Sequence, residues 1–173
     1  TSAYKFINNP LRDQNRRKAN KPHPLAATVI CIQEGIKKLR NVVSIKEEVR
    51  RSSGGIAREE TAVLWRGMKN LYATNEFLNF GGTELAPMST TTSFEIAVQY
   101  GICPTGSLLF KIVVPTALQH GADLQWCSAF PGEAEVLYPP LTYLKSRKRY
   151  QEIISEDNIK VTIIEVEPDL SAV

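Results

Sequence analysis

Apolar residues recur at helical spacing in the first third of the chain. Four of them lie three or four positions apart, namely Val29, Ile32, Ile36 and Leu39. Side chains at this spacing share one helix face, so a helix is predicted over residues 25–41. Residues 45–51 either continue this helix or restart it, and the Ser-Ser-Gly-Gly sequence at 52–55 is expected to end it. Residues 1–24 are polar and rich in Asn, Pro and Arg, which predicts an irregular arm.

The remainder of the chain alternates strand-like runs with short helical stretches. Strands are predicted over residues 61–68, 108–114, 122–126, 135–138, 149–155 and 159–167. A short helix is predicted over residues 70–80, with Thr74 or Asn75 as its N-cap. A second is predicted over residues 93–100, with Ser93 as its N-cap. Helices that come first and strands that follow favour the α+β class with antiparallel sheets.

Length and composition are those of an ordinary globular chain. A length of 173 residues suffices to bury one core, so residues 1–173 are expected to form a single domain. The net charge of +3 suits a small anionic ligand and is too low for a nucleic-acid partner. No apolar run reaches the length of a membrane span, and no signal peptide is visible. The start at Thr1 is consistent with a processed form or an excised domain.

Several familiar kinds of site are missing from the sequence. The three cysteines, Cys31, Cys103 and Cys127, are far apart and form no CxxC, so we expect reduced core thiols. His23 and His120 have no ligand-forming neighbours at metal-site spacing, which predicts structural or surface histidines and no metal. The basic run 145–149 is predicted to be a solvated loop between two strands. A nucleotide would need an architecture other than a P-loop or a glycine-rich dinucleotide fingerprint.

Two glutamates lie two positions apart after a Pro-Gly turn. Glu133 and Glu135 would share one strand face, because side chains in a strand repeat every two residues. Two exposed carboxylates placed in this way repel each other by about 0.2–1 kcal/mol. That cost suggests a role for the pair, and a solvated strand face is the alternative.

Three features follow one another in the chain. They are the pair Arg66-Gly67 at the end of a predicted strand, the hydroxyl-rich Ser89-Thr90-Thr91, and the glutamate pair. Together they resemble the R-S-E class of mono-ADP-ribosyltransferases, which contains arginine-specific toxins and vertebrate ecto-enzymes, over about residues 64–140. The class that has His and Tyr instead of Arg and Ser fits less well, because no histidine follows a matching strand. The resemblance implies N-terminal helices over two roughly perpendicular antiparallel sheets with NAD between them.

The resemblance also implies a role for each residue of the motif. Arg66 would bind the NAD pyrophosphate, which suits a planar guanidinium, and the main chain of Gly67 would hold the nicotinamide carboxamide. Glu135 would stabilise the oxocarbenium-like transition state, with Ser89 fixing its orientation and Thr90 beside the NAD. A strand-end salt bridge for Arg66 and a strand-edge hydroxyl for Ser89 are the structural alternatives. The family's usual Ser-Thr-Ser becomes Ser-Thr-Thr here, which adds a methyl group at Thr91.

The residues around the glutamate pair complete the implied site. Glu133 would face the acceptor, since an acidic residue here marks arginine as the acceptor in the family. Tyr100 matches an aromatic near the nicotinamide, or else packs at the end of its helix. Phe130 would contact the protein substrate, whereas Trp126 is expected in the core.

These assignments predict transfer of ADP-ribose from NAD to an arginine of a protein, with release of nicotinamide. An NAD glycohydrolase that uses water as acceptor is the first alternative. An inactive interaction module of the same fold is the second. The protein is expected to be a monomer that binds NAD as a substrate and an acceptor protein with an accessible arginine. No metal, nucleic acid or membrane is expected as a partner.

Overall fold

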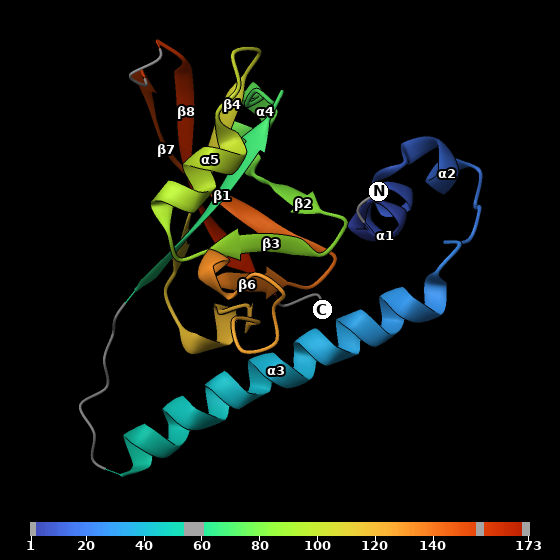
Figure 1. Cartoon of the computed structure of the whole chain (residues 1–173), viewed down its shortest axis with the longest axis vertical. Helices are drawn as coiled ribbons and strands as arrows, with labels where there is room; N and C mark the ends of the chain where they lie inside the picture. The colour runs from blue at the N-terminus through green and yellow to red at the C-terminus, as the bar shows by residue number, and fades with distance from the viewer. Residues whose placement is uncertain (1–2, 54–60, 155–157, 171–173) are drawn as a thin grey trace.

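The N-terminal part of the chain is helical (Figure 1). A computed structural model describes residues 3–53, 61–154 and 158–170. The predicted irregular arm is wrong, because residues 3–18 form α1 (Ala3–Arg12) and α2 (Gln14–Lys18). The carboxylate of Asp13, between them, caps α2 by accepting hydrogen bonds from the N–H groups of Asn15 and Arg16. The polar residues that suggested a loop therefore include a helix cap.

One long helix, α3 (Ala26–Ser52), follows. Apart from Leu25, it includes both predicted segments, 25–41 and 45–51, without a break. It ends at Ser52, the first residue of the predicted stop, and Gly54 and Gly55 lie outside the described residues. The Arg40 guanidinium ties α3 to residues 118–120. It donates to the carbonyl oxygens of Leu118 at 2.8 Å and His120 at 3.0 Å.

The remaining elements include the predicted strands and short helices, although some bounds differ: the predicted helix 70–80 begins at Asn75, the predicted strand 122–126 has only two residues, and the predicted strand 149–155 begins at Thr142. In chain order they are β1 (Ala62–Lys69), α4 (Asn75–Phe80), β2 (Gly82–Glu84), β3 (Met88–Thr91), α5 (Phe94–Gly101), β4 (Ser107–Val114), η1 (Ala117–Gln119), β5 (Ala122–Asp123), η2 (Pro131–Glu133), β6 (Glu135–Tyr138), β7 (Thr142–Ile154) and β8 (Lys160–Asp169). Thr74 caps α4 and Ser93 caps α5, each through a side-chain oxygen that accepts a backbone N–H.

The α+β class is confirmed, but the strands differ from the predicted pair of antiparallel sheets. Among the described residues they form one sheet in the order β2-β7-β8-β4-β1-β3-β6-β5, and β4 and β8 are parallel. β1 pairs with β4 at eight positions but with β3 at one, Trp65 opposite Thr91. At this junction β3 and β6 run across the direction of β1 and β4 (Figure 1). The expected two sheets are thus two parts of one sheet.

The basic run 145–149 is not a loop. It lies inside β7, where a bulge falls between Ser146 and Arg149. The Arg147 guanidinium is 3.3 Å from the carboxylates of both Glu165 and Glu167 on β8. Cross-strand ion pairs therefore stabilise a strand in a segment whose composition indicated a loop.

The core lies on both faces of the sheet. The larger cluster includes Leu64, Met88, Phe110, Tyr138 and Val166, and a smaller one of Leu109, Val161 and Ile163 lies under α5. The prediction of core thiols is wrong, because Cys31 and Cys127 are exposed and Cys103 is half-buried, all three being free. No helix among the described residues is both long and apolar enough to cross a membrane.

Both histidines are structural, as predicted. A ring nitrogen of His23 lies 2.9 Å from the carbonyl oxygen of Ile7, which ties α1 to the start of α3. A ring nitrogen of His120 lies 2.9 Å from the carbonyl oxygen of Gly121. Each ring therefore fixes a stretch of main chain.

Gly67 lets α5 lie directly on β1. A Cβ atom at this position would be 1.9 Å from the carbonyl oxygen of Ala97 and 2.6 Å from the amide nitrogen of Gly101. These are backbone atoms of α5, which cannot move away without displacing the helix. Gly67 thus has a packing role independent of any ligand.

We expect Gly67→Ala to lower the free energy of unfolding by about 1–3 kcal/mol or more, because the added methyl group overlaps the α5 main chain. Gly35→Ala is the matched control. Nothing lies within 4 Å of a Cβ there, so the loss of a helical glycine should stabilise the protein by about 0.5–1 kcal/mol. Urea unfolding measures both changes. A Gly67→Ala protein as stable as the wild type would contradict the packing role.

Candidate active site

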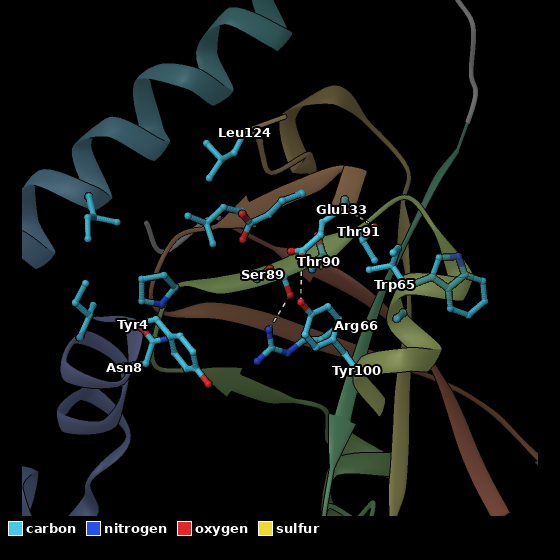
Figure 2. A pocket seen from close by; sticks show the side chains of 18 of the residues that line it. Tyr4, Asn8, Trp65, Arg66, Ser89, Thr90, Thr91, Tyr100, Leu124 and Glu133 are labelled. Atoms are coloured by element: carbon cyan, nitrogen blue, oxygen red, sulfur yellow. Dashed lines mark hydrogen bonds between the residues drawn. The ribbon is translucent and has the colours of Figure 1, made fainter. Parts of the chain in front are cut away.

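A cavity of about 520 Å³ is lined by both parts of the sheet, by α5 and by α1 (Figure 2). Seven of the eight residues predicted for the site line it: Arg66, Gly67, Ser89, Thr90, Tyr100, Glu133 and Glu135. They come from β1, β3, α5, η2 and β6, so residues far apart in the sequence meet in one place. Phe130 is not among the lining residues.

The Arg66 side chain is largely buried, and only some of its hydrogen-bond donors have partners among the described residues. One terminal nitrogen donates to the carbonyl oxygen of Ser89 at 2.7 Å, and the other lies 3.8 Å from the Glu84 carboxylate. Its Nε is buried and has no hydrogen-bond partner among the described residues. Burial lowers the pKa of Arg66, an effect that Glu84 opposes and that Arg12 adds to. The guanidinium therefore has donor capacity left for an anion.

The register of β3 and β6 arranges the serine and the second glutamate. Thr91 lies opposite Glu135 and Ser89 opposite Leu137, so Ser89 and Glu135 are diagonal neighbours on the cavity face. A glutamate side chain can reach such a neighbour, and their contact remains a prediction. Thr90 also lines the cavity, but it is buried, and its hydroxyl donates to the carbonyl oxygen of Val136 at 2.6 Å. That hydroxyl is thus engaged in strand pairing.

The two glutamates do not share a strand face, contrary to the prediction. Glu133 ends the 3-10 turn η2, and Glu135 begins β6. Ala134 between them is left-handed with φ 45°, which breaks the alternation of a strand. Both residues nevertheless line the cavity, which they reach by different backbone routes.

Hydroxyl groups hold Glu133 at two points. The Thr91 hydroxyl donates to the carbonyl oxygen of Glu133 at 2.6 Å and accepts the N–H of Ser93 at 3.0 Å. The Tyr100 hydroxyl donates to the Glu133 carboxylate at 2.7 Å. This hydrogen bond, followed by burial and the charges of Glu133 and Glu135, raises the pKa of Tyr100. Tyr100 is half exposed and lines the cavity, so it is not a packing aromatic.

The loop between β5 and η2 presents aromatic side chains to the surface. Trp126 is 74% exposed, which corrects the prediction that it lies in the core. Phe130 is 67% exposed and immediately precedes η2. Its N–H donates to the hydroxyl of Ser128 at 3.0 Å, which helps to shape the turn.

Helix α1 contributes to the cavity, which the sequence did not predict. Tyr4, Ile7, Asn8 and Arg12 of this helix line it, together with Ile32 of α3. Arg12 pairs with both carboxylate oxygens of Glu84, at 2.9 and 3.0 Å, so two guanidiniums lie near one carboxylate. The helical spacing of positions 4, 7, 8 and 12 was a usable signal, which the polar composition of the arm obscured. The described residues contain no cluster of His, Cys, Asp and Glu suited to a metal ion.

The sequence as a whole matches a known family. The model of the ADP-ribosyltransferase exoenzyme family covers residues 1–167. This chain belongs to that family. The family consists of NAD-dependent mono-ADP-ribosyltransferases. No curated protein matches the sequence.

Solved structures of ADP-ribosyltransferases share the fold. HopU1 of Pseudomonas syringae pv. tomato DC3000 is 18% identical with a TM-score of 0.64, over 98% of this chain and 66% of HopU1. The Plx2a toxin from Paenibacillus larvae is 15% identical with a TM-score of 0.65, over 97% of this chain and 81% of Plx2a. Vis from Vibrio splendidus, solved in complex with agmatine, is 19% identical with a TM-score of 0.60, over 99% and 70% of the two chains. At these identities the likeness shows the fold.

The Thr91 hydroxyl should hold η2 in place. We expect Thr91→Val to speed amide hydrogen exchange over residues 128–135 by roughly tenfold, because the carbonyl of Glu133 and the N–H of Ser93 lose their partner. Thr91→Ser keeps the hydroxyl and is the control, with exchange in this segment close to that of the wild type. Mass spectrometry of exchanged peptides measures both variants. Equal exchange in the valine and serine variants would contradict this role.

Proposed function

We propose that this domain transfers ADP-ribose from NAD to the arginine side chain of an acceptor protein and releases nicotinamide. The observation that carries the proposal is the meeting of Arg66, Glu133 and Glu135 in one cavity. Its volume of about 520 Å³ is in the range of small-molecule sites.

The cation pair on one side of the cavity supports binding of the pyrophosphate. Arg12 and Arg66 share the single carboxylate of Glu84, which leaves an excess of positive charge on this side of the cavity. Arg66 is desolvated, so a bound anion would stabilise it more than the same anion would in water. A pyrophosphate offers several acceptor oxygens to the donors that Arg66 does not use.

Glu135 is suited to the bond-breaking step. Cleavage of the nicotinamide–ribose bond develops positive charge on the ribose ring, and a fixed carboxylate beside the ring stabilises it. Glu135 begins β6, where pairing with Thr91 and the bulk of the sheet fix its main chain. Ser89, its diagonal neighbour, would orient the carboxylate.

Glu133 is suited to binding the acceptor. A guanidinium is a poor nucleophile while it is protonated, and a carboxylate can both bind it and take a proton as it attacks. Glu133 lies in a turn at the cavity, next to a loop with the exposed aromatics Trp126 and Phe130. The complex of Vis with agmatine, a small guanidinium compound, shows a ligand of this chemistry on a related fold.

Replacing Glu133 and replacing Glu135 should have different effects on NAD hydrolysis and on transfer to an acceptor. Glu135→Gln should abolish nicotinamide release with or without an acceptor, because it removes the charge that stabilises the transition state. Glu133→Gln should abolish transfer to agmatine and retain part of the NAD hydrolysis. Chromatography of nicotinamide, ADP-ribose and the agmatine adduct measures all three products.

The products of the wild-type protein distinguish a transferase from a glycohydrolase. A wild type that yields ADP-ribose and no adduct would establish the NAD glycohydrolase. No nicotinamide release at micromolar enzyme would favour the inactive module. Equal loss of both activities in Glu133→Gln would contradict the division of roles between the glutamates.

Arg66→Lys should weaken NAD binding roughly tenfold to a hundredfold, because an ammonium cannot hold the Ser89 carbonyl and a phosphate in the same fork geometry. Arg149→Lys is the matched control. The Arg149 side chain is 77% exposed on β7, and its replacement should leave NAD binding unchanged. Titration calorimetry with NAD measures both variants. Unchanged affinity in Arg66→Lys would contradict the pyrophosphate role.

A further inference from the structure

Glu133 is fixed in the fold at its main chain as well as at its carboxylate. Its N–H donates to the carbonyl oxygen of Phe130 at 3.0 Å, and its own carbonyl accepts the Thr91 hydroxyl at 2.6 Å. The main chain of Glu133 therefore cannot swing freely. What remains is rotation of the side chain, and the Tyr100 hydroxyl, at 2.7 Å from Oε1, restrains that rotation.

We propose that the Tyr100 hydroxyl is a positioning group for Glu133 and favours a guanidinium over water as the acceptor of ADP-ribose. The inference rests on the proposed function. The aromatic ring alone would suffice for contact with the nicotinamide, and a phenylalanine would supply it. Within the described part of the chain the hydroxyl donates to the Glu133 carboxylate and to no other group, so its contribution is specific to that carboxylate.

The geometry assigns one oxygen of Glu133 to each partner. Tyr100 donates to Oε1, which leaves Oε2 to accept an N–H of the incoming guanidinium. As that nitrogen bonds to the ribose anomeric carbon, the bond to the nicotinamide nitrogen breaks and its electron pair leaves with nicotinamide. The proton lost by the attacking nitrogen goes to Oε2. Water has a single small oxygen and gains much less from a carboxylate oriented in this way.

The surroundings keep the hydrogen bond intact at neutral pH. The groups that face the Tyr100 hydroxyl are Glu133, Glu135 and Tyr4 of α1, and their effects all raise the pKa of Tyr100. A raised pKa keeps the hydroxyl protonated, and so able to donate, through the neutral and mildly alkaline range. Tyr100 and Glu133 are 33 positions apart in sequence, so this contact also joins α5 to η2.

Replacement of Tyr100 by phenylalanine tests the proposal. The readout is the ratio of agmatine adduct to ADP-ribose formed in the same reaction, because partial misfolding would lower both products alike. We expect Tyr100→Phe to lower this ratio roughly tenfold, with a higher KM for agmatine, since a hydrogen bond to a charged group is lost. Tyr72→Phe is the matched control. Its hydroxyl donates to the carbonyl oxygen of Thr105, also at 2.7 Å, and its loss should leave the ratio unchanged.

A double variant shows whether Tyr100 acts through Glu133. If it does, Tyr100→Phe should lower the ratio in the wild-type background and leave it unchanged in a Glu133→Asp background, which keeps a carboxylate for transfer but places it one carbon farther from the Tyr100 hydroxyl. An unchanged ratio in Tyr100→Phe, or an additive loss in the double variant, would overturn the inference and leave the proposed function standing. A wild type that forms no adduct would overturn the proposed function, and this inference with it.

Discussion

The change of partners at β1 is the constraint on which the rest of the structure depends. β1 pairs with β4 along its length and with β3 at the single position Trp65–Thr91, so the two parts of the sheet diverge beyond that point. Arg66 follows Trp65 directly, and its guanidinium reaches the carbonyl oxygen of Ser89 across the divergence. Because β1 and β3 do not pair beyond this point, a cavity lies between them, and the buried Arg66 side chain is at its edge.

Helix α5 links the separate parts of this site. It lies against β1 at Gly67, where no side chain could fit, and it begins at Ser93, whose N–H is held by the Thr91 hydroxyl. Its last turn then presents Tyr100 to Glu133. One short helix thus fixes the distance between the strand that carries Arg66 and the turn that carries Glu133.

On the side of the cavity away from Glu133, the positive charges of Arg12 and Arg66 are only partly balanced by Glu84. Glu84 is a single carboxylate with one close guanidinium, that of Arg12, and one more distant, that of Arg66. A buried cation with an incomplete set of partners is costly, and an anionic ligand relieves that cost. An anion bound at Arg66 would therefore be coupled to the placement of α1, although α1 lies far from the motif in sequence.

The sequence by itself determined the elements whose signals are local. The apolar spacing in α3, the caps at Thr74 and Ser93, and the β-rich runs were readable because each depends on neighbours within a few positions. The order of arginine, serine and glutamates was readable through its resemblance to a known family, and seven of the eight residues predicted for the site do line one cavity.

Only the tertiary structure decided features that depend on distant partners. α1 is helical despite its polar composition, and Arg147 lies in a strand because Glu165 and Glu167 on β8 face it. The left-handed Ala134 separates two glutamates that a regular strand would have placed side by side. Local preferences act over a few residues, whereas ion pairs, hydrogen bonds and close packing join residues wherever the fold brings them together, and those contacts outweighed the local pattern at each of these positions.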